Sequence, residues 1–135
     1  QPDALLRIEP EVGGNSRISE DDYIEGSPEL IAEIAASSAS YDLNDKLNAY
    51  RRNGVKEYIV WQMYENRLDW FILKEGRYIL LEADKSGIIR SETFPGLWLA
   101  VDALREGNLA EVLTVLQQGL QINEHQDFSL TLQQS

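Results

Sequence analysis

The sequence predicts an α/β (α+β) fold: a central mixed β-sheet with a crossover helix, an antiparallel meander and a C-terminal helix. Three observations carry this prediction. The short apolar run at 29–36 is typical of a strand that is covered on both faces. The segment 42–52 has apolar residues at helical spacing. Residues 55–73 are rich in β-branched and aromatic side chains, which favour strands.

The first half of the chain supplies the strand, helix and strand of a crossover unit. Residues 3–8 predict a first strand, and 9–22 predict a long polar loop with a glycine-rich turn. The strand at 29–36 is followed by the helix at 42–52. We expect this helix to cross over, in the usual right-handed sense, to a parallel strand at 55–63.

The second half predicts the meander and the C-terminal helix. Strand-like segments alternate with turns such as Lys74-Glu75-Gly76, at 55–63, 67–73 and 77–81. The segment 108–121 has an apolar stripe at helical spacing, formed by Leu109, Val112, Leu113, Leu116 and Leu120. We expect a single domain over 1–122. Residues 123–135 would form a C-terminal tail, either loose or folded as a short packed helix.

The amino-acid composition excludes several kinds of catalytic and metal-binding site. The chain has no cysteine and one histidine, His125, which excludes disulfides, thiolate nucleophiles and metal sites built from several histidines. A metal here would need oxygen ligands, as Mg²⁺, Mn²⁺ or Ca²⁺ do. Because no apolar run approaches the roughly 20 residues of a membrane span, we expect no membrane association. The absence of cysteine fits a reducing compartment such as the cytoplasm.

Charge weighs against a general nucleic-acid-binding surface. The chain of 135 residues carries 23 acidic and 12 basic residues, a net charge of −11. Affinity for phosphates comes mainly from Lys and Arg, so DNA binding would need a local basic patch or a bound metal. The chain also begins abruptly at Gln1-Pro2-Asp3, and we expect further residues upstream.

Glu33 is the most informative residue of the sequence, because it interrupts the apolar run at 29–36. An ionised carboxylate buried without a partner costs several kcal/mol or more, so Glu33 must be paired, bind a metal or be protonated. Lys46 lies on the apolar stripe of the next helix, between Leu43 and Leu47. A structural ion pair, or a lysine that reaches out to water, explains the pattern as well as a catalytic pair does.

A metal site is the functional interpretation of these residues. Asp3 opens the first strand, and neighbouring strands would bring its carboxylate close to that of Glu33. A divalent cation would explain why two negative charges share one site. The backbone carbonyl beside Glu33, that of Ile34, would add an oxygen ligand. Lys46 would then orient a water nucleophile or stabilise a developing negative charge.

An ordered set of motifs resembles the Uma-type endonuclease family, which is abundant in cyanobacteria and belongs to the PD-(D/E)XK superfamily. The family pattern is an acidic residue opening a strand, a strand with one glutamate, an Asp-x-x-x-Lys-x-x-x-Tyr helix, a Gly-Val-x-Glu-Tyr strand and a Phe-Pro-Gly-Leu turn. The matching segments lie between residues 2 and 122: Pro2-Asp3, 28–38, 41–50, 54–61 and Phe94-Pro95-Gly96-Leu97.

The resemblance implies a restriction-endonuclease-like core in which Asp3 and Glu33 are carboxylates for Mg²⁺. The superfamily places a lysine two residues after the glutamate, where this chain has Ala35. In this family the lysine is moved to the following helix, and Lys46 occupies that position. The family also has an N-terminal helical region with a further acidic residue, which this chain lacks.

Two functions follow from the resemblance. The first is a Mg²⁺- or Mn²⁺-dependent endonuclease, a hydrolase of phosphodiester bonds in DNA. The alternative is a catalytically degenerate nuclease-fold protein that acts as an interaction or regulatory module. A basic surface around Glu33 would favour the nuclease, and an acidic one the module. We also expect a homodimer, because nucleases that cut both strands often pair two copies, with the meander or the C-terminal helix as the contact.

Overall fold

The computed structural model describes residues 4–7, 14, 16–18, 24–26, 28–35, 43–63 and 65–134. The chain divides into two compact units, Gln1–Leu80 and Leu81–Ser135. This division falls inside the domain expected at 1–122, which stays a prediction.

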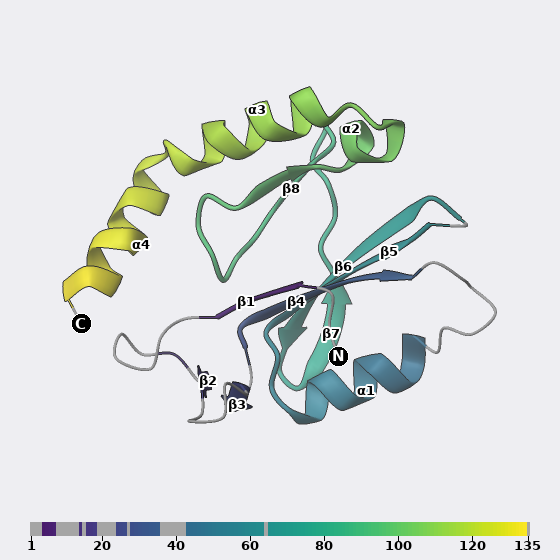
Figure 1. Ribbon diagram of the computed structural model, residues 1–135, viewed down its shortest axis with the longest axis vertical. Coiled ribbons are helices and arrows are strands. Elements are labelled where there is room, and N and C mark those ends of the chain that lie inside the picture. The colour runs from purple at the N-terminus through teal and green to yellow at the C-terminus, as the bar shows by residue number, and fades with distance from the viewer. Residues whose placement is uncertain are drawn as a thin grey trace. The chain divides into compact units, whose positions relative to one another are not determined.

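The first unit contains a five-stranded mixed sheet with one crossover helix (Figure 1). Strands β4 and β5 are parallel, and α1 connects them, whereas the other neighbouring strands are antiparallel. The order across the sheet is β1 (Ala4–Leu6), β4 (Leu30–Ala35), β5 (Glu57–Gln62), β6 (Arg67–Lys74) and β7 (Arg77–Leu80), and α1 spans Leu43–Arg52. The predicted fold class, with 29–36 beside 55–63, is therefore confirmed.

Helix α1 covers the face of the sheet that carries the core of this unit (Figure 1). Leu47 and Tyr50 of α1 pack against buried residues of β4 and β5 and of the turn before β5, namely Ile31, Ala35, Val55, Tyr58 and Val60. The helix ends as its sequence predicts. Asn53 donates its backbone N–H to the carbonyl of Ala49, and Gly54 takes the left-handed conformation at φ 75°.

The meander follows the predicted pattern. The hairpin between β6 and β7 turns at Glu75 and Gly76, whose φ angles are 51° and 79°. Two consecutive positive φ values are typical of the tight turn that matches the twist of paired strands. One sequence interpretation is wrong, because the segment 9–22, predicted as a loop, contains β2 (Ser16–Ile18). This strand pairs with β3 (Ile24–Gly26).

The second unit contains a short hairpin and three helices. Strand β8 (Ile88–Arg90) pairs with β9 (Trp98–Ala100), and α2 (Val101–Glu106), α3 (Leu109–Leu120) and α4 (Asn123–Gln134) follow. The helix predicted at 108–121 is confirmed, and the side chain of Asn108 caps it by accepting the N–H of Glu111. Of the two alternatives for the tail, the structure has the helix.

The predicted apolar stripe of α3 is only partly buried. Val115 is 3% exposed, whereas Leu109 and Leu113 are 61% and 57% exposed. Helical periodicity identified the helix correctly but did not identify which of its apolar residues find neighbours.

Candidate active site

Glu33 lies in the middle of β4, and its side chain is 6% exposed. Side chains alternate along a strand, so Glu33 shares a face with Ile31 and Ala35, which belong to the core covered by α1. The carboxylate therefore points toward the helix, and it must obtain hydrogen bonds from protein donors there.

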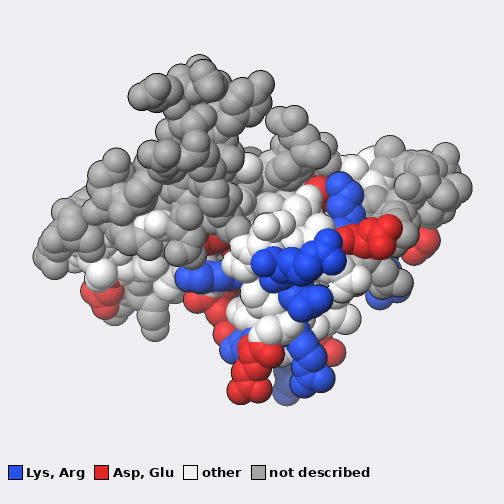
Figure 2. All heavy atoms as spheres, turned by 90° about the horizontal axis from the view of Figure 1, so that it is seen from below, with Lys and Arg blue, Asp and Glu red and all other residues white. Residues whose placement is uncertain are grey.

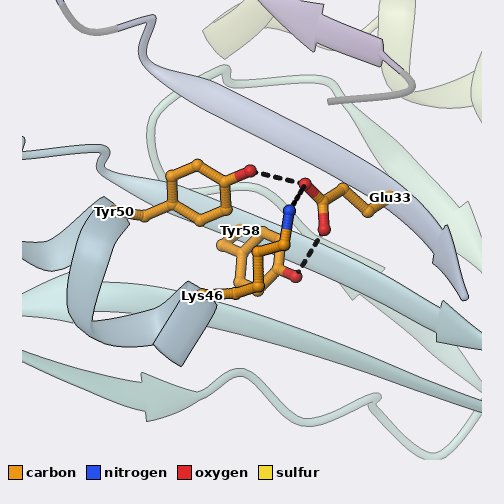
Figure 3. A network of polar contacts seen from close by, with 4 residues as sticks. All are labelled: Glu33, Lys46, Tyr50 and Tyr58. Carbon is orange, nitrogen blue, oxygen red and sulfur yellow. Dashed lines mark hydrogen bonds and ion pairs between the residues drawn. The ribbon is translucent and has the colours of Figure 1, made fainter. Parts of the chain in front are cut away.

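Three side chains donate to the Glu33 carboxylate, and Figure 3 shows how they converge on it. The Tyr50 hydroxyl donates to Oε1 at 2.5 Å, and the Tyr58 hydroxyl donates to Oε2 at 3.0 Å. The Lys46 ammonium lies 3.4 Å from Oε1, which makes it both a hydrogen bond and an ion pair. The predicted contact between Lys46 and Glu33 is confirmed.

The local fold explains why these donors meet. Lys46 and Tyr50 are four residues apart on α1, so they lie one above the other on the helix face that meets the sheet. Tyr58 precedes Val60 by two residues on β5, and Val60 is the direct partner of Glu33 in the parallel pairing. The rings of Tyr50 and Tyr58 pack with centroids 4.9 Å apart, which fixes both hydroxyls toward the carboxylate.

The site has a buried side and a side open to solvent. Tyr58 is fully buried, whereas the Lys46 side chain is 40% exposed. The ammonium group therefore connects the buried carboxylate to the surface of the molecule. An anionic group that approached this surface would meet Lys46 before it met Glu33, and the positive charge would attract it.

Asp69 is a second buried carboxylate on the same sheet face, and sequence reasoning missed it. Glu33, Val60 and Asp69 are paired in one row across β4, β5 and β6. Asp69 is 7% exposed and accepts a hydrogen bond from Arg67 Nε at 3.1 Å, but within the described part of the chain its Oδ2 has no hydrogen-bond partner. The available signal in the sequence was a carboxylate inside the otherwise apolar run from Leu68 to Leu73.

Glu57 is also buried, but it lies on the opposite face of the sheet. Its Oε1 accepts a hydrogen bond from the indole nitrogen of Trp70 at 2.7 Å, and the two residues are 0% and 1% exposed. Trp70 is therefore a core residue of the sheet. The pair accounts for the glutamate in the Gly-Val-x-Glu-Tyr motif as a structural residue.

The other predicted site residues have different outcomes. Asp3 lies outside the described residues, but Ala4, which follows it, pairs with Ala32, which precedes Glu33. The Ile34 side chain is 52% exposed, on the face of β4 opposite to Glu33. Among the described residues, no group of three or more Asp, Glu, His or Cys side chains is placed to hold a metal.

The donor chemistry of Glu33 fits a hard cation. A carboxylate that faces a partly open site is the kind of ligand that Mg²⁺ and Mn²⁺ prefer. Both oxygens of Glu33 already accept hydrogen bonds, Oε1 from Tyr50 and Oε2 from Tyr58. A cation would therefore bind beside these donors or in place of one, and it would need at least one further acidic ligand. Asp3 is the predicted one.

The exposed surface of the segment 43–80 is basic, in contrast to the whole chain. The segment has seven basic and five acidic residues. Two of the acidic residues, Glu57 and Asp69, are buried, whereas six of the basic residues are exposed and Lys46 is partly exposed. Figure 2 looks onto the α1 side from below the view of Figure 1 and shows Lys and Arg side chains gathered there.

His125, the single histidine of the sequence, is partly buried in α4, and its Nδ1 lies 2.9 Å from the carbonyl oxygen of Pro95. The residue joins α4 to the Phe-Pro-Gly-Leu turn of the second unit. It therefore has a structural role there.

The comparisons with known proteins agree with the motif pattern. A family model named Uma2 and described as "Putative restriction endonuclease" matches residues 1–102. No curated protein matches the sequence significantly. Within the described residues, no helix has both the length and the apolar character needed to cross a bilayer. The fold, with its mixed sheet, crossover helix and C-terminal helices, is consistent with the restriction-endonuclease-like class. The family model covers about three quarters of the chain, and the protein belongs to the Uma2 family.

Proposed function

We propose that the protein is a divalent-metal-dependent endonuclease that hydrolyses phosphodiester bonds in DNA at Glu33. The observation that carries this proposal is a buried carboxylate contacted by an ammonium group at 3.4 Å in a member of a family described as endonucleases. The Tyr50 and Tyr58 hydroxyls satisfy the buried carboxylate, and Lys46, which is 40% exposed, presents a positive charge to an anion that approaches the site from solvent.

Asp3, Glu33 and the carbonyl of Ile34 are the proposed ligands of Mg²⁺ or Mn²⁺. The pairing of Ala4 with Ala32 supports this choice, because it aligns the chain positions next to Asp3 and Glu33. When bound, the cation would activate a water molecule and neutralise charge on the phosphate. If calorimetry detects no Mg²⁺ or Mn²⁺ binding at millimolar concentration, the metal ligands are assigned wrongly.

The residues of the chain would position and neutralise the substrate. Lys46 would hold the water or a phosphate oxygen by its positive charge as negative charge develops. Tyr50 and Tyr58 would keep the Glu33 carboxylate in one orientation, because each donates to a different oxygen. Such preorganisation lowers the cost of aligning the reacting groups.

A nicking assay on supercoiled plasmid tests the role of Lys46. In Mg²⁺, the Lys46→Ala protein should lose about 100-fold or more of the wild-type rate, the scale expected for removing one preorganised charge-stabilising group. Lys85→Ala is the matched control, because it removes an exposed lysine of the second unit and should cut at the wild-type rate. Activity that does not change in Lys46→Ala would contradict the proposal.

The second candidate is an interaction module that keeps the fold without catalysis. The net charge of −11 favours it, because such a charge repels DNA overall. The basic surface of the segment 43–80 favours the nuclease, because it provides the local patch that DNA binding needs. Absence of cleavage of both plasmid and single-stranded DNA by the folded wild-type protein would favour the module.

A further inference from the structure

Five exposed basic residues lie together at the end of the first unit where α1 meets β7. Helix α1 ends with Arg51 and Arg52, and the chain then turns into β5. The Tyr78 hydroxyl of β7 donates to the carbonyl of Val55 at 2.6 Å, which ties this turn to the hairpin of β6 and β7. We call these residues the basic end; they are Arg51, Arg52, Lys56, Lys74 and Arg77.

Backbone pairing holds the members of the basic end close to one another. Lys74 and Arg77 are direct partners in the hairpin. The carbonyl of Lys56 accepts the N–H of Leu73 at 2.8 Å, so Lys56 lies beside the start of that pair. Helix α1, which carries Arg51 in its last turn, contacts β7.

Basic residues outnumber acidic ones in the two segments that form this surface. Within the two segments that form it, 51–56 and 73–80, Glu75 is the single acidic residue against five basic ones. The next acidic residue along β5, Glu57, is buried on the far side of the sheet, where it accepts from Trp70. Although the chain has a net charge of −11, these two segments thus have an excess of four basic residues.

The basic end lies at a distance from Lys46 that suits a nucleic-acid backbone. Arg51 follows Lys46 by five positions on α1, which corresponds to about 7.5 Å along the helix axis. One strand of duplex DNA advances about 3.4 Å along its axis per nucleotide, so this axial separation corresponds to about two nucleotides. The remaining basic residues would extend the contact further from the site.

We propose that the basic end is a docking surface for the phosphate backbone of duplex DNA, which it holds beside the Glu33 site. The proposal rests on the proposed function for the identity of the ligand. The contacts would be electrostatic and independent of base sequence, because Lys and Arg on an exposed surface reach phosphates rather than base edges. Their role is to raise affinity and to fix where the strand crosses Glu33.

Binding in the absence of metal tests the proposal separately from cleavage. The measurement is fluorescence anisotropy of a labelled DNA duplex of about 20 base pairs, with the full chain in EDTA, over a range of salt concentrations. The test variant is Arg52→Ala/Arg77→Ala, and the control is Lys85→Ala/Arg105→Ala. Both remove two exposed positive charges, one pair from the basic end and the other from the second unit. Circular dichroism checks that both fold.

The expected result is a selective loss. The test variant should bind about tenfold or more weaker at about 0.1 M salt, and its slope of log affinity against log salt should fall by about 2, since each lost phosphate contact removes about 0.9. The control should match the wild type in slope. Equal losses in both variants, or a wild-type protein that binds no duplex, would overturn the proposal.

Cleavage distinguishes the failure of this proposal from the failure of the proposed function. Plasmid nicking that depends on Lys46, with unchanged DNA binding in Arg52→Ala/Arg77→Ala, would leave the endonuclease assignment standing and remove the docking surface. Selective loss of binding in that variant, together with a wild-type protein that does not cut, would keep the surface and remove the endonuclease assignment.

Discussion

At the scale of single residues, the Glu33 carboxylate organises its surroundings. Lys46 and Tyr50 of α1 and Tyr58 of β5 donate hydrogen bonds to it. Hydrogen bonds to a charged acceptor contribute more to stability than those between neutral groups, and a buried charge that loses one is destabilised further. The site should therefore be sensitive to the removal of a single hydroxyl.

Tyr58→Phe should lower the free energy of unfolding by about 1–3 kcal/mol, because it removes a donor to the buried Glu33 carboxylate. Tyr78→Phe is the matched control. It removes a hydroxyl that donates to a neutral carbonyl, that of Val55, and should cost about 1 kcal/mol. Urea denaturation measures both. A smaller loss in Tyr58→Phe than in Tyr78→Phe would show that Glu33 does not depend on this bond.

The sequence was sufficient to find Glu33 and Lys46, but not the tyrosines around them. A glutamate in an apolar strand and a lysine on an apolar helix stripe each break a one-dimensional pattern, so each is visible without a structure. Tyr50 packs against the core of the first unit, and its hydroxyl donates to Glu33. Tyrosine fits a core pattern without any anomaly, so its hydroxyl partner depends on the tertiary packing.

At the scale of elements, local signals determined most of the fold. The strand β4, the crossover helix and the hairpin turn at Glu75-Gly76 follow from apolar runs, helical spacing and turn residues. The strand β2 was missed, because Ser16–Ile18 has no period-two apolar pattern and gains its pairing from β3. The exposure of Leu109 on α3 was missed for the same reason, since neighbours and not periodicity decide burial.

Replacing Gly119 of helix α3 with alanine should destabilise the protein. Gly→Ala inside a helix ordinarily raises stability by about 0.5–1 kcal/mol. A Cβ at Gly119 would overlap the carbonyl oxygen of Gly96 and would lie 2.8 Å from the Trp98 side chain. We therefore expect a loss of about 1–3 kcal/mol by thermal denaturation, whereas Gln117→Ala on the exposed face should change little. A higher melting temperature for Gly119→Ala would contradict this packing.

The turn before β8 should lose stability at low pH. A side-chain hydrogen bond from Arg90 and a backbone hydrogen bond from Ile88 lower the pKa of Asp84. Because the pKa of Asp84 is lower in the folded protein than in the unfolded chain, where it is about 4, its ionised carboxylate stabilises the fold at pH values above about 4. This stabilisation is lost as the pH falls through the pKa of Asp84 in the folded protein. At pH 7 the melting temperature of the wild type should therefore be higher than that of Asp84→Asn, and the difference between the two should shrink below about pH 4. A difference independent of pH would refute this.

At the scale of the whole molecule, charge is unevenly distributed. The chain carries −11, whereas its segment 43–80 has more basic than acidic residues. The composition of the whole chain therefore argues against DNA binding. In the segment 43–80, however, the burial of Glu57 and Asp69 leaves more basic than acidic side chains at the surface. Net charge could be predicted from the sequence, but which charges reach the surface could not, because that depends on the direction of each side chain in the sheet.

Assembly is the second question at this scale, and we predict a homodimer. The edge strand β7 carries Ile79 and Leu80 at 47% and 48% exposure, and an exposed apolar edge is a common site of pairing. The interface should bury more than roughly 1,000 Å² in total. Light scattering of the full-length protein at micromolar concentration should give twice the chain mass, and Leu80→Lys should reduce it. A monomer mass for the wild type would refute the prediction.

The central claim is that Glu33 is a catalytic carboxylate rather than a structural one. The most direct measurement is the rate of plasmid nicking in Mg²⁺ by the Glu33→Gln protein. Glutamine keeps the size of the side chain and its carbonyl acceptor for one tyrosine hydroxyl, but it removes the charge that would hold the metal. The account predicts a folded protein that cuts about 100-fold more slowly than the wild type, or slower still. A folded Glu33→Gln protein that nicks plasmid at the wild-type rate would contradict the account.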